Sequence, residues 1–340
     1  MSRTGVEEKP PWRAVPPAVR RGVEATLGSA IVRGARVYGG YGPTPTFRLL
    51  LADGRRAFFK GVNAASNEFM RGAIVREERV YRDATELIGP WAPECYGGFQ
   101  CDDWRVLLLQ DVGPKSAPPW ARTLTRKVAH AYADFHAHTL GRALPDWLPG
   151  PQAQIPRGWP QRVVAESDGF RAVAELAVGH EREALDWLRM AIPRLIQLAE
   201  TAPNLPGPYA LLHGDTRSDN LRFRDGRLYL FDWPSTEIGR SEFDLVGFAQ
   251  SVTVDGGVAP EQVVAWYEER LPLRADAMDA AVAWLTLFFA DLAWRPPIPG
   301  LPRLRSFQRQ QLTVMLMWAA RRLRMPEPAW ATAISQNMIR

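Results

Sequence analysis

The sequence predicts an α+β fold with a small β-rich lobe and a larger, mainly α-helical lobe. Three observations favour this class. Short apolar runs alternate with Gly/Pro-rich turns over residues 35–112, helical periodicity dominates residues 113–340, and one strand-turn-strand segment interrupts the helical half. The length of 340 residues also exceeds what one hydrophobic core usually serves. We therefore expect a hinge between two lobes near residues 110–114.

The β-rich lobe follows an N-terminal extension or helix over residues 1–34. The run ARVYGGYGPTPTFRLLL, from Ala35, predicts two strands joined by a Gly/Pro-rich turn, and LADGRR leads into a third strand, AFFKGV. CYGGFQ and RVLLLQDV predict two further strands, which end near Gly113. Residues 1–17 combine prolines and charges without apolar periodicity, so disorder is expected only there.

Helices account for most of the remaining chain. Apolar spacing predicts amphipathic helices over 121–140 and 181–200, the second with a kink at Pro193. Helical pattern returns from Ser241 and is broken by RPPIPGLPRL. The longest apolar run, AAVAWLTLFFA from Ala280, is too short to cross a membrane and predicts a buried helix.

Composition narrows the classes of partner. The net charge is +5 and the pI about 9.4, yet the arginines are scattered rather than gathered with aromatic residues, so we expect no nucleic-acid partner. The two cysteines, Cys95 and Cys101, have no metal or redox spacing. With no secretory signal either, the sequence favours a cytoplasmic protein without membrane attachment, as a monomer or homodimer.

The strongest chemical signal is the octapeptide HGDTRSDN, residues 213–220, followed by Phe231-Asp232-Trp233. Phosphoryl transfer needs a carboxylate that orients and deprotonates a hydroxyl, and oxygen ligands for Mg²⁺. Asp215 suits the first role, and Asn220 and Asp232 suit the second. Asp and Asn are also common turn residues. The ordered set with a second aspartate after a strand is more specific than a turn, and it predicts a kinase.

These residues resemble the catalytic and metal loops of the aminoglycoside-phosphotransferase family, which is related to the protein kinases. His-Gly-Asp replaces the protein-kinase His-Arg-Asp, as in choline, homoserine and fructosamine kinases. The resemblance spans about residues 35–320 and is sharpest over 211–247, where Asp244 matches a position that braces the catalytic loop. It implies a protein-kinase-like two-lobed fold and the cofactors ATP (or GTP) and Mg²⁺. The implied acceptor is a hydroxyl of a small molecule.

The resemblance also identifies residues for the nucleotide. Lys60, at the end of the run AFFK, corresponds to the lysine that contacts phosphates in kinases. A glutamate on the following helix should pair with it. Helical spacing from Ile74 to Tyr81 allows either Glu77 or Glu78. Family spacing before Tyr81 favours Glu77.

Two further segments complete the expected nucleotide site. Gly39, Gly40 and Gly42 lie in the first hairpin turn, where backbone N–H groups would cover the triphosphate, although glycines in a hairpin often serve only the turn. Gln110, Asp111 and Val112 follow the last apolar strand at the expected hinge. Their backbone groups are predicted to bond the edge of the adenine.

Arg217 departs from the family pattern, which often has histidine two residues after the catalytic aspartate. A cation there would neutralise charge on the transferring phosphoryl group or bind a nearby carboxylate. His136 and His138, in YADFHAHTL, fall on a predicted helix without a third ligand, so packing or surface roles are favoured over a metal site.

The sequence thus predicts a small-molecule O-phosphotransferase. A non-catalytic nucleotide-binding relative is the main alternative, although its usual losses, of the lysine, the aspartate or a metal ligand, are not seen here. The acceptor stays open between an antibiotic, such as an aminoglycoside, and a metabolite, such as an amino alcohol or sugar derivative. We expect substrate contacts from residues 141–208 and from the helices after Ser251. Four residues are candidates for those contacts: Trp159, Asp255, Asp291 and Trp294.

Overall fold

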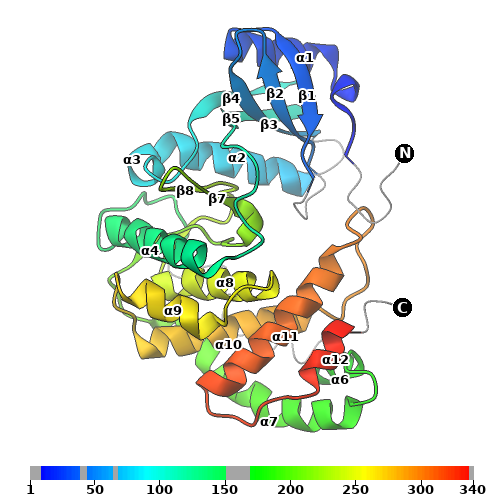
Figure 1. Cartoon of the computed structure of the whole chain (residues 1–340), viewed down its shortest axis with the longest axis vertical. Coiled ribbons are helices and arrows are strands. Elements are labelled where there is room, and N and C mark those ends of the chain that lie inside the picture. Colours follow the sequence, from blue (N-terminus) through cyan, green and yellow to red (C-terminus); the bar gives the residue numbers. More distant parts are fainter. Residues whose placement is uncertain (1–8, 39–43, 64–67, 151–168, 337–340) are drawn as a thin grey trace. The chain divides into compact units, whose positions relative to one another are not determined.

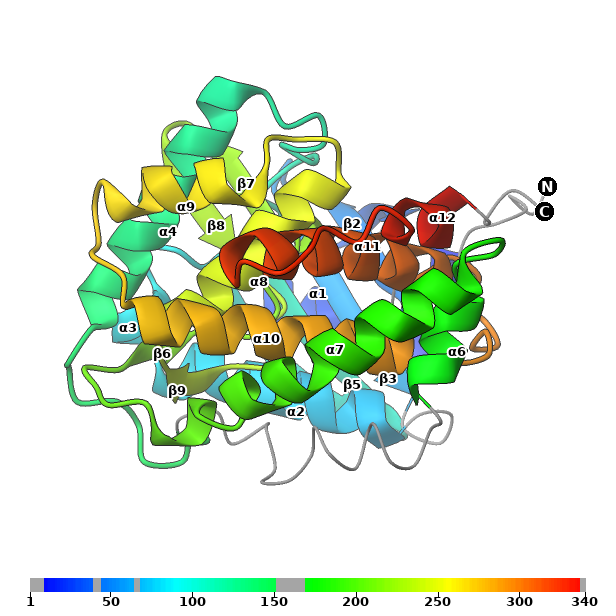
Figure 2. The same ribbon diagram turned by 90° about the horizontal axis from the view of Figure 1, so that it is seen from below.

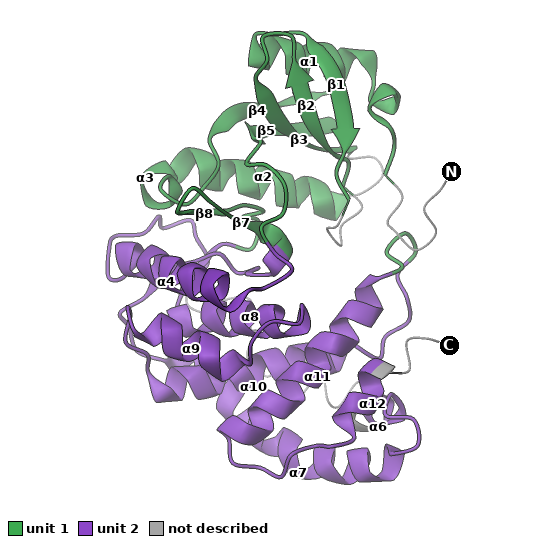
Figure 3. Cartoon of the chain, viewed as in Figure 1, with its two compact units in different colours: residues 1–116, 219–235, 299–302 green, residues 117–218, 236–298, 303–340 purple. Residues whose placement is uncertain are grey.

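A computed structural model of the chain describes residues 9–38, 44–63, 68–150 and 169–336. The chain divides into two compact units (Figure 3). Unit 1 comprises residues 1–116, 219–235 and 299–302, and unit 2 comprises residues 117–218, 236–298 and 303–340. The segment 219–235, which carries Asn220 and Asp232, therefore belongs with the N-terminal part of the chain.

Unit 1 contains an antiparallel sheet of five strands in the order β1-β2-β3-β5-β4 (Figure 1). Its strands are β1 (Ile31–Arg36), β2 (Thr46–Leu51), β3 (Arg56–Asn63), β4 (Cys95–Cys101) and β5 (Trp104–Gln110). The other elements of this unit are η1 (Trp12–Ala14), α1 (Pro17–Leu27), α2 (Glu68–Asp83), α3 (Thr85–Ile88), β7 (Leu221–Arg224) and β8 (Arg227–Leu230), with the short helix η3 (Ser218–Asn220) leading into β7.

The strand β1 begins at Ile31 rather than at Ala35, where the Gly/Pro pattern predicted it. The disorder expected for residues 1–17 is wrong for residues 9–17, and residues 1–8 lie outside the described residues. Trp12 packs edge-on against Phe47 and Phe59, with ring centroids 5.1 Å and 5.3 Å away, and becomes part of the sheet's core. Contact with this core gives residues 9–17 a structure that local periodicity does not reveal.

The helix α2 packs on β3 and β5 of the sheet. Four of its residues are buried by this packing: Ile74, Glu77, Val80 and Tyr81. The hairpin of β7 and β8 joins the same unit, because the backbone N–H of Leu230 donates to the carbonyl of Trp91 at 2.6 Å. Arg227 adds bonds to the carbonyls of Gly89, Pro90 and Ala92.

Unit 2 is mainly helical (Figure 2). Its helices are α4 (Arg122–Thr139), α6 (Gly169–Glu175), α7 (Glu181–Ala199), η2 (Ala202–Asn204), α8 (Ser241–Val254), α9 (Pro260–Glu268), α10 (Ala275–Leu292), α11 (Leu304–Arg322) and α12 (Ala331–Gln336), and two short strands, β6 (Ala210–Leu212) and β9 (Glu237–Gly239), pair antiparallel. The helix α7 continues past Pro193.

The apolar run from Ala280 lies in α10, which packs against α7, α8 and α11 (Figure 2). Its burial among three helices confirms the prediction of a buried helix. None of the helices in the described ranges is both long and apolar enough to span a bilayer.

Candidate active site

Lys60 lies at the centre of an ion-pair cluster in unit 1. Its Nζ is 2.5 Å from Oε2 of Glu77 and 2.5 Å from Oδ1 of Asp232. The pair with Glu77 is the one that family spacing favoured, and Glu78 instead forms an ion pair with Arg105 on β5. Lys60 lies within β3 rather than at its end, because β3 continues to pair with β5 as far as residue 63.

Burial sets the electrostatics of this cluster. The side chain of Lys60 is 9 % exposed and that of Glu77 is 1 % exposed, whereas that of Asp232 is 36 % exposed. Burial by itself lowers the pKa of Lys60, but the charges of Asp232 and Glu77 outweigh it and raise the pKa above its ordinary value. Lys60 is therefore a fixed cation, and the carboxylate of Asp232 is the member of the cluster most open to solvent.

Asp232 and Asn220 are linked through the backbone. The N–H of Phe231 donates to the carbonyl of Asn220 at 3.1 Å, and the N–H of Asp232 donates to Oε1 of Glu77 at 3.1 Å. Asp232 has a φ of 71°, a left-handed conformation that is uncommon for residues other than glycine and tolerated by aspartate. Glu77 therefore fixes both the ammonium of Lys60 and the backbone that carries Asp232.

The oxygen donors present fit Mg²⁺ bound together with a nucleotide. Mg²⁺ is commonly held by one or two protein oxygens plus substrate phosphates, rather than by an all-protein cage. Asp232 supplies a carboxylate and Asn220 an amide oxygen. In the part of the chain that the structure describes, no group of three or more His, Cys, Asp and Glu residues is arranged to hold a metal by itself.

Asp215 and Arg217 lie in unit 2, on the loop after β6. The Nε of Arg217 is 3.1 Å from Oδ1 of Asp215, so one of the two expected partners of Arg217, a nearby carboxylate, is present. Asp244 holds the start of this loop. Its Oδ2 accepts the N–H of His213 at 2.6 Å and its Oδ1 accepts the N–H of Gly214 at 2.9 Å. This geometry agrees with the bracing position that the resemblance indicated.

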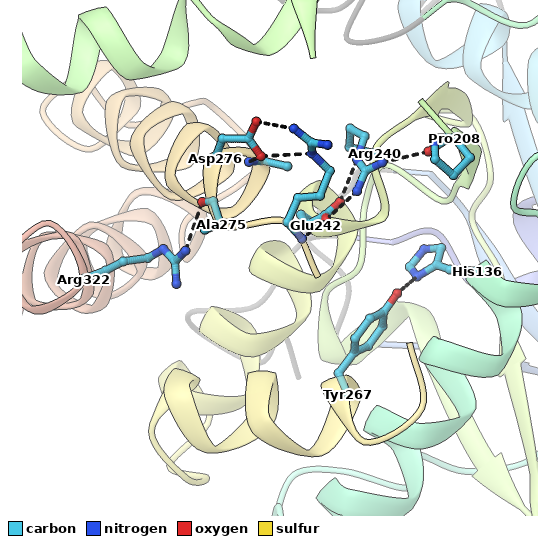
Figure 4. A network of polar contacts seen from close by, with 10 residues as sticks. His136, Pro208, Arg240, Glu242, Tyr267, Ala275, Asp276 and Arg322 are labelled. Carbon is cyan, nitrogen blue, oxygen red and sulfur yellow. Dashed lines mark hydrogen bonds and ion pairs between the residues drawn. The ribbon is translucent and has the colours of Figure 1, made fainter. Parts of the chain in front are cut away.

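His136 extends the support of the loop. Its imidazole is fully buried, and its Nε2 lies 3.2 Å from Oδ2 of Asp244. Its Nδ1 lies 2.8 Å from the hydroxyl of Tyr267 (Figure 4). The packing role favoured for His136 is thus a polar one. Tyr267 was not singled out in the sequence, because it is 131 residues from His136 and has no local signal. Figure 4 also shows the buried pair of Arg240 and Glu242, 2.8 Å apart, in the same unit.

The expected hinge residues lie at the end of β5 and directly after it, in unit 1. Gln110 is the last residue of β5, and its N–H donates to the carbonyl of Glu94 at 2.8 Å. The buried carboxylate of Asp111 accepts the N–H of Gly113 at 3.0 Å and lies 3.3 Å from Nε of Arg48. Arg48, on β2, also donates to the carbonyl of Gly113. The side chain of Arg48 therefore closes the turn that contains Val112.

The strand β7 also brings arginines toward this turn, since a Cβ added at Gly113 would lie 3.1 Å from Nη1 of Arg224. Arg222, two residues earlier on that strand, interacts electrostatically with Arg48 and Asp111. It is 7 % exposed, and its Nη1 donates to the carbonyls of Leu221 and Asp219 at 2.6 Å and 3.3 Å. Its guanidinium carbon lies 4.9 Å from the ring centroid of Phe231. Burial, followed by the charge of Arg48, lowers its pKa to about 10. Sequence reasoning missed Arg48 and Arg222, although arginines between apolar residues were a visible signal in TFRLLL and LRFR.

The remaining candidate residues either lie outside the described residues or make local contacts. Gly39, Gly40, Gly42 and Trp159 lie outside the described residues. Asp291 forms an ion pair with Arg295 at 2.6 Å, and Asp255 is the C-terminal cap of α8. The guanidinium of Arg295 also lies over the ring of Trp294, 5.8 Å from its centroid.

Comparison with solved structures identifies related folds. A spectinomycin phosphotransferase in complex with ADP and spectinomycin has a TM-score of 0.59 and 13% sequence identity, over 89% of this chain and 98% of the other. An aminoglycoside phosphotransferase mutant with ADP and hygromycin B has a TM-score of 0.55 and 14% identity, over 95% and 99%. A protein assigned as a fructosamine-3-kinase from Thermobifida fusca has a TM-score of 0.50 and 20% identity, over 87% and 98%.

These likenesses confirm the predicted fold class, an α+β fold like that of the kinase-related phosphotransferases. None of the curated proteins compared with the sequence matches it significantly. The model of the phosphotransferase enzyme family matches residues 38–285, which include the cluster of Lys60, the loop of Asp215 and the brace of Asp244. The chain therefore belongs to this phosphotransferase family, the family of the aminoglycoside phosphotransferases, and its membership supports a small-molecule kinase.

Proposed function

We propose that this protein transfers the γ-phosphoryl group of a nucleoside triphosphate to a hydroxyl group of a small molecule. The observation that carries the proposal is the position of Lys60 between two carboxylates, Glu77 and Asp232, each 2.5 Å from its Nζ. A buried ammonium of fixed position is suited to bind phosphate oxygens, whose charge it partly neutralises. Family membership supports the same reaction class.

The nucleotide would be bound by Lys60 and by the hinge. Lys60 contacts the phosphates, and Glu77 orients it, while the backbone groups of Gln110, Asp111 and Val112 bond the nucleobase. Two of the structural relatives were solved with ADP, which favours ATP or another purine nucleotide as the donor. Gly39, Gly40 and Gly42 remain candidates to cover the phosphates.

Mg²⁺ would be held by the carboxylate of Asp232 and the amide oxygen of Asn220. When bound, the ion would neutralise charge on the phosphates of the nucleotide. Both residues belong to unit 1 and are joined by the hydrogen bond from Phe231 to Asn220. The bond from the Asp232 backbone to Glu77 fixes the carboxylate's position beside Lys60.

The acceptor hydroxyl would be deprotonated by Asp215. Its carboxylate takes the proton as the hydroxyl oxygen forms a bond to the γ-phosphorus, while the bond from that phosphorus to the β,γ-bridging oxygen breaks and the nucleoside diphosphate leaves. Arg217, whose Nε is 3.1 Å from Oδ1 of Asp215, would hold the carboxylate in place. Asp244 fixes the loop through the N–H groups of His213 and Gly214.

The acceptor class is tested by a substrate panel. Aminoglycosides, spectinomycin-type and macrolide antibiotics, peptide antibiotics, amino alcohols and ketoamines would be supplied with ATP or GTP and Mg²⁺. Diphosphate release would be measured by a coupled assay, and the phosphorylated product by mass spectrometry. We expect one acceptor class to give a product heavier by one phosphoryl group. If all classes fail, and the protein also binds no nucleotide, the proposed function is wrong.

A further inference from the structure

Two arginines lie at the position proposed for the nucleobase, and nothing in the phosphoryl-transfer chemistry requires them. Arg48 projects from β2 to the turn of residues 111–113, and Arg222 projects from β7. The strand β7 lies along the same segment, because Ser116 Oγ accepts the N–H of Phe223 at 2.8 Å and donates to its carbonyl at 3.0 Å. All of these contacts are within unit 1.

The charges of the two guanidinium groups repel each other, and the charge of Arg48 contributes to the lowered pKa of Arg222. Each of them interacts with the carboxylate of Asp111, Arg48 through an ion pair of 3.3 Å and Arg222 through a longer-range attraction. Arg222 is buried and the side chain of Arg48 is 28 % exposed, and such a pair of cations is unfavourable unless their charges and donors are used. The carboxylates of Asp111 and Asp219 offset part of this charge.

Arg222 has donor capacity that the described residues do not use. The residue is 7 % exposed. Its Nε is buried and has no hydrogen-bond partner in the described part of the chain. The ring of Phe231 covers its guanidinium. An unpaired buried donor is unfavourable, so a ligand that accepts from it would be bound favourably.

We propose that Arg48 and Arg222 make the nucleobase position rich in hydrogen-bond donors, so that this kinase uses GTP in preference to ATP. The inference rests on the proposed function, since it takes residues 110–113 to be the place where the base binds. Guanine presents two adjacent acceptors, O6 and N7, which match the fork of a guanidinium. Adenine presents N7 beside an N6 amino group, whose hydrogens oppose the same donors.

The first test uses the unmodified protein and needs no acceptor. Dissociation constants for GMP-PNP and AMP-PNP are measured by calorimetry in the presence of Mg²⁺. We expect GMP-PNP to bind at least about 10-fold more tightly, since a bidentate contact of an arginine with guanine discriminates by that order. The analogue 7-deaza-GTP, which lacks the N7 acceptor, should compete about 10-fold less well than GTP.

The second test assigns the preference to a residue. Arg222→Met should weaken GMP-PNP by about 10-fold while leaving AMP-PNP unchanged or tighter, so that the preference is lost. Arg82→Met is the matched control, because Arg82 belongs to the same unit but lies on α2, with a side chain that is 66 % exposed and paired with Asp83. This control should keep the full preference for GMP-PNP.

The outcomes separate this inference from the function on which it rests. AMP-PNP binding as tightly as GMP-PNP to the unmodified protein, or equal weakening of both analogues by Arg222→Met, would overturn the nucleobase preference and leave the kinase proposal standing. Binding of neither analogue would overturn the kinase proposal, and the inference with it. If Arg222→Met does not fold, the 7-deaza-GTP comparison alone decides, and equal competition by GTP and 7-deaza-GTP contradicts the inference.

Discussion

The carboxylate of Glu77 lies 2.5 Å from Nζ of Lys60 and is buried with it on the sheet side of α2. The same carboxylate also accepts the backbone N–H of Asp232 at 3.1 Å. One side chain therefore fixes two groups of the proposed nucleotide site, a cation from β3 and a carboxylate from the segment after β8. Any change at Glu77 should disturb both.

Glu77→Gln is expected to destabilise the protein by about 3 kcal/mol, because it removes one partner of a buried ion pair, while Asp232 still neutralises part of the lysine charge. Nucleotide affinity and turnover should fall together as Lys60 loses its position. Glu78→Gln is the matched control. Its ion pair with Arg105 is more exposed and does not involve Lys60, so the loss should be smaller. Urea denaturation and nucleotide calorimetry measure both, and equal effects of the two variants would contradict the assignment.

The loss of stability caused by Glu77→Gln should not change between pH 7 and pH 9, because Lys60 stays protonated over this range. The folded-state pKa of Lys60 is raised above the unfolded value of about 10.4, against the opposing effect of burial. A raised lysine pKa gives a stabilisation that is fully present below the unfolded pKa and is lost only as pH rises through the folded pKa. Denaturation of both proteins at pH 7, 8 and 9 checks this. A difference that shrinks over this range would show that Lys60 is already losing its proton.

Asp232→Asn is expected to abolish the Mg²⁺-dependent part of nucleotide stabilisation. The amide removes a negative charge that a hard divalent cation prefers, and it also weakens the pair with Lys60. A ligand at 100 times its dissociation constant stabilises the folded state by about 2.7 kcal/mol, so the loss is visible in thermal melting. Melting curves with AMP-PNP and GMP-PNP, with and without Mg²⁺, give the measurement. Asp225→Asn, on the exposed turn between β7 and β8, should keep the full Mg²⁺ effect.

Local patterns predicted the elements well where burial follows the chain's own periodicity. The strands of the sheet, the helix that carries Glu77 and the buried run in α10 all show it. The choice between Glu77 and Glu78 was different, because both fall on the stripe from Ile74 to Tyr81. Only the packing of α2 on the sheet turns Glu77 toward Lys60 and Glu78 toward Arg105.

Contacts between distant residues were the part that the sequence did not reveal. Arg48 closes a turn 65 residues away. Trp12 packs on Phe47 of β2, with the whole first strand of the sheet between them in the sequence. At Gly34 an added Cβ would lie 2.4 Å from the Trp12 ring, a packing requirement with no counterpart in local spacing. Such contacts depend on which surfaces meet, and neither periodicity nor turn chemistry specifies that.

Asp244→Asn is expected to reduce turnover while largely preserving nucleotide binding. The carboxylate accepts the N–H groups of His213 and Gly214 and lies 3.2 Å from Nε2 of His136. An amide can accept only through its oxygen, so one of these donors is left unsatisfied in a buried site, at a cost of about 1–3 kcal/mol. Denaturation should show that loss of stability, and calorimetry an unchanged affinity for the nucleotide. A variant with normal turnover would show that the loop does not depend on this brace.

Asp215→Asn is expected to lower turnover by about 10²- to 10⁴-fold, the usual contribution of a general base. The substitution keeps the size of the side chain and a possible contact with Arg217, but it removes the site that accepts the proton of the hydroxyl. Since Asp215 belongs to unit 2 and the cluster of Lys60 to unit 1, nucleotide affinity and the Mg²⁺-dependent melting shift should stay unchanged.

Arg217→Met provides the comparison. If Arg217 only orients the carboxylate, its removal should cost much less than that of Asp215, and the double variant should be no slower than Asp215→Asn alone, because residues that act as a unit are not additive. Rates come from the coupled assay on the acceptor identified by the panel. Near-normal turnover of Asp215→Asn on that acceptor would exclude Asp215 as the base, and a further loss in the double variant would give Arg217 a role of its own at the transferring phosphoryl group.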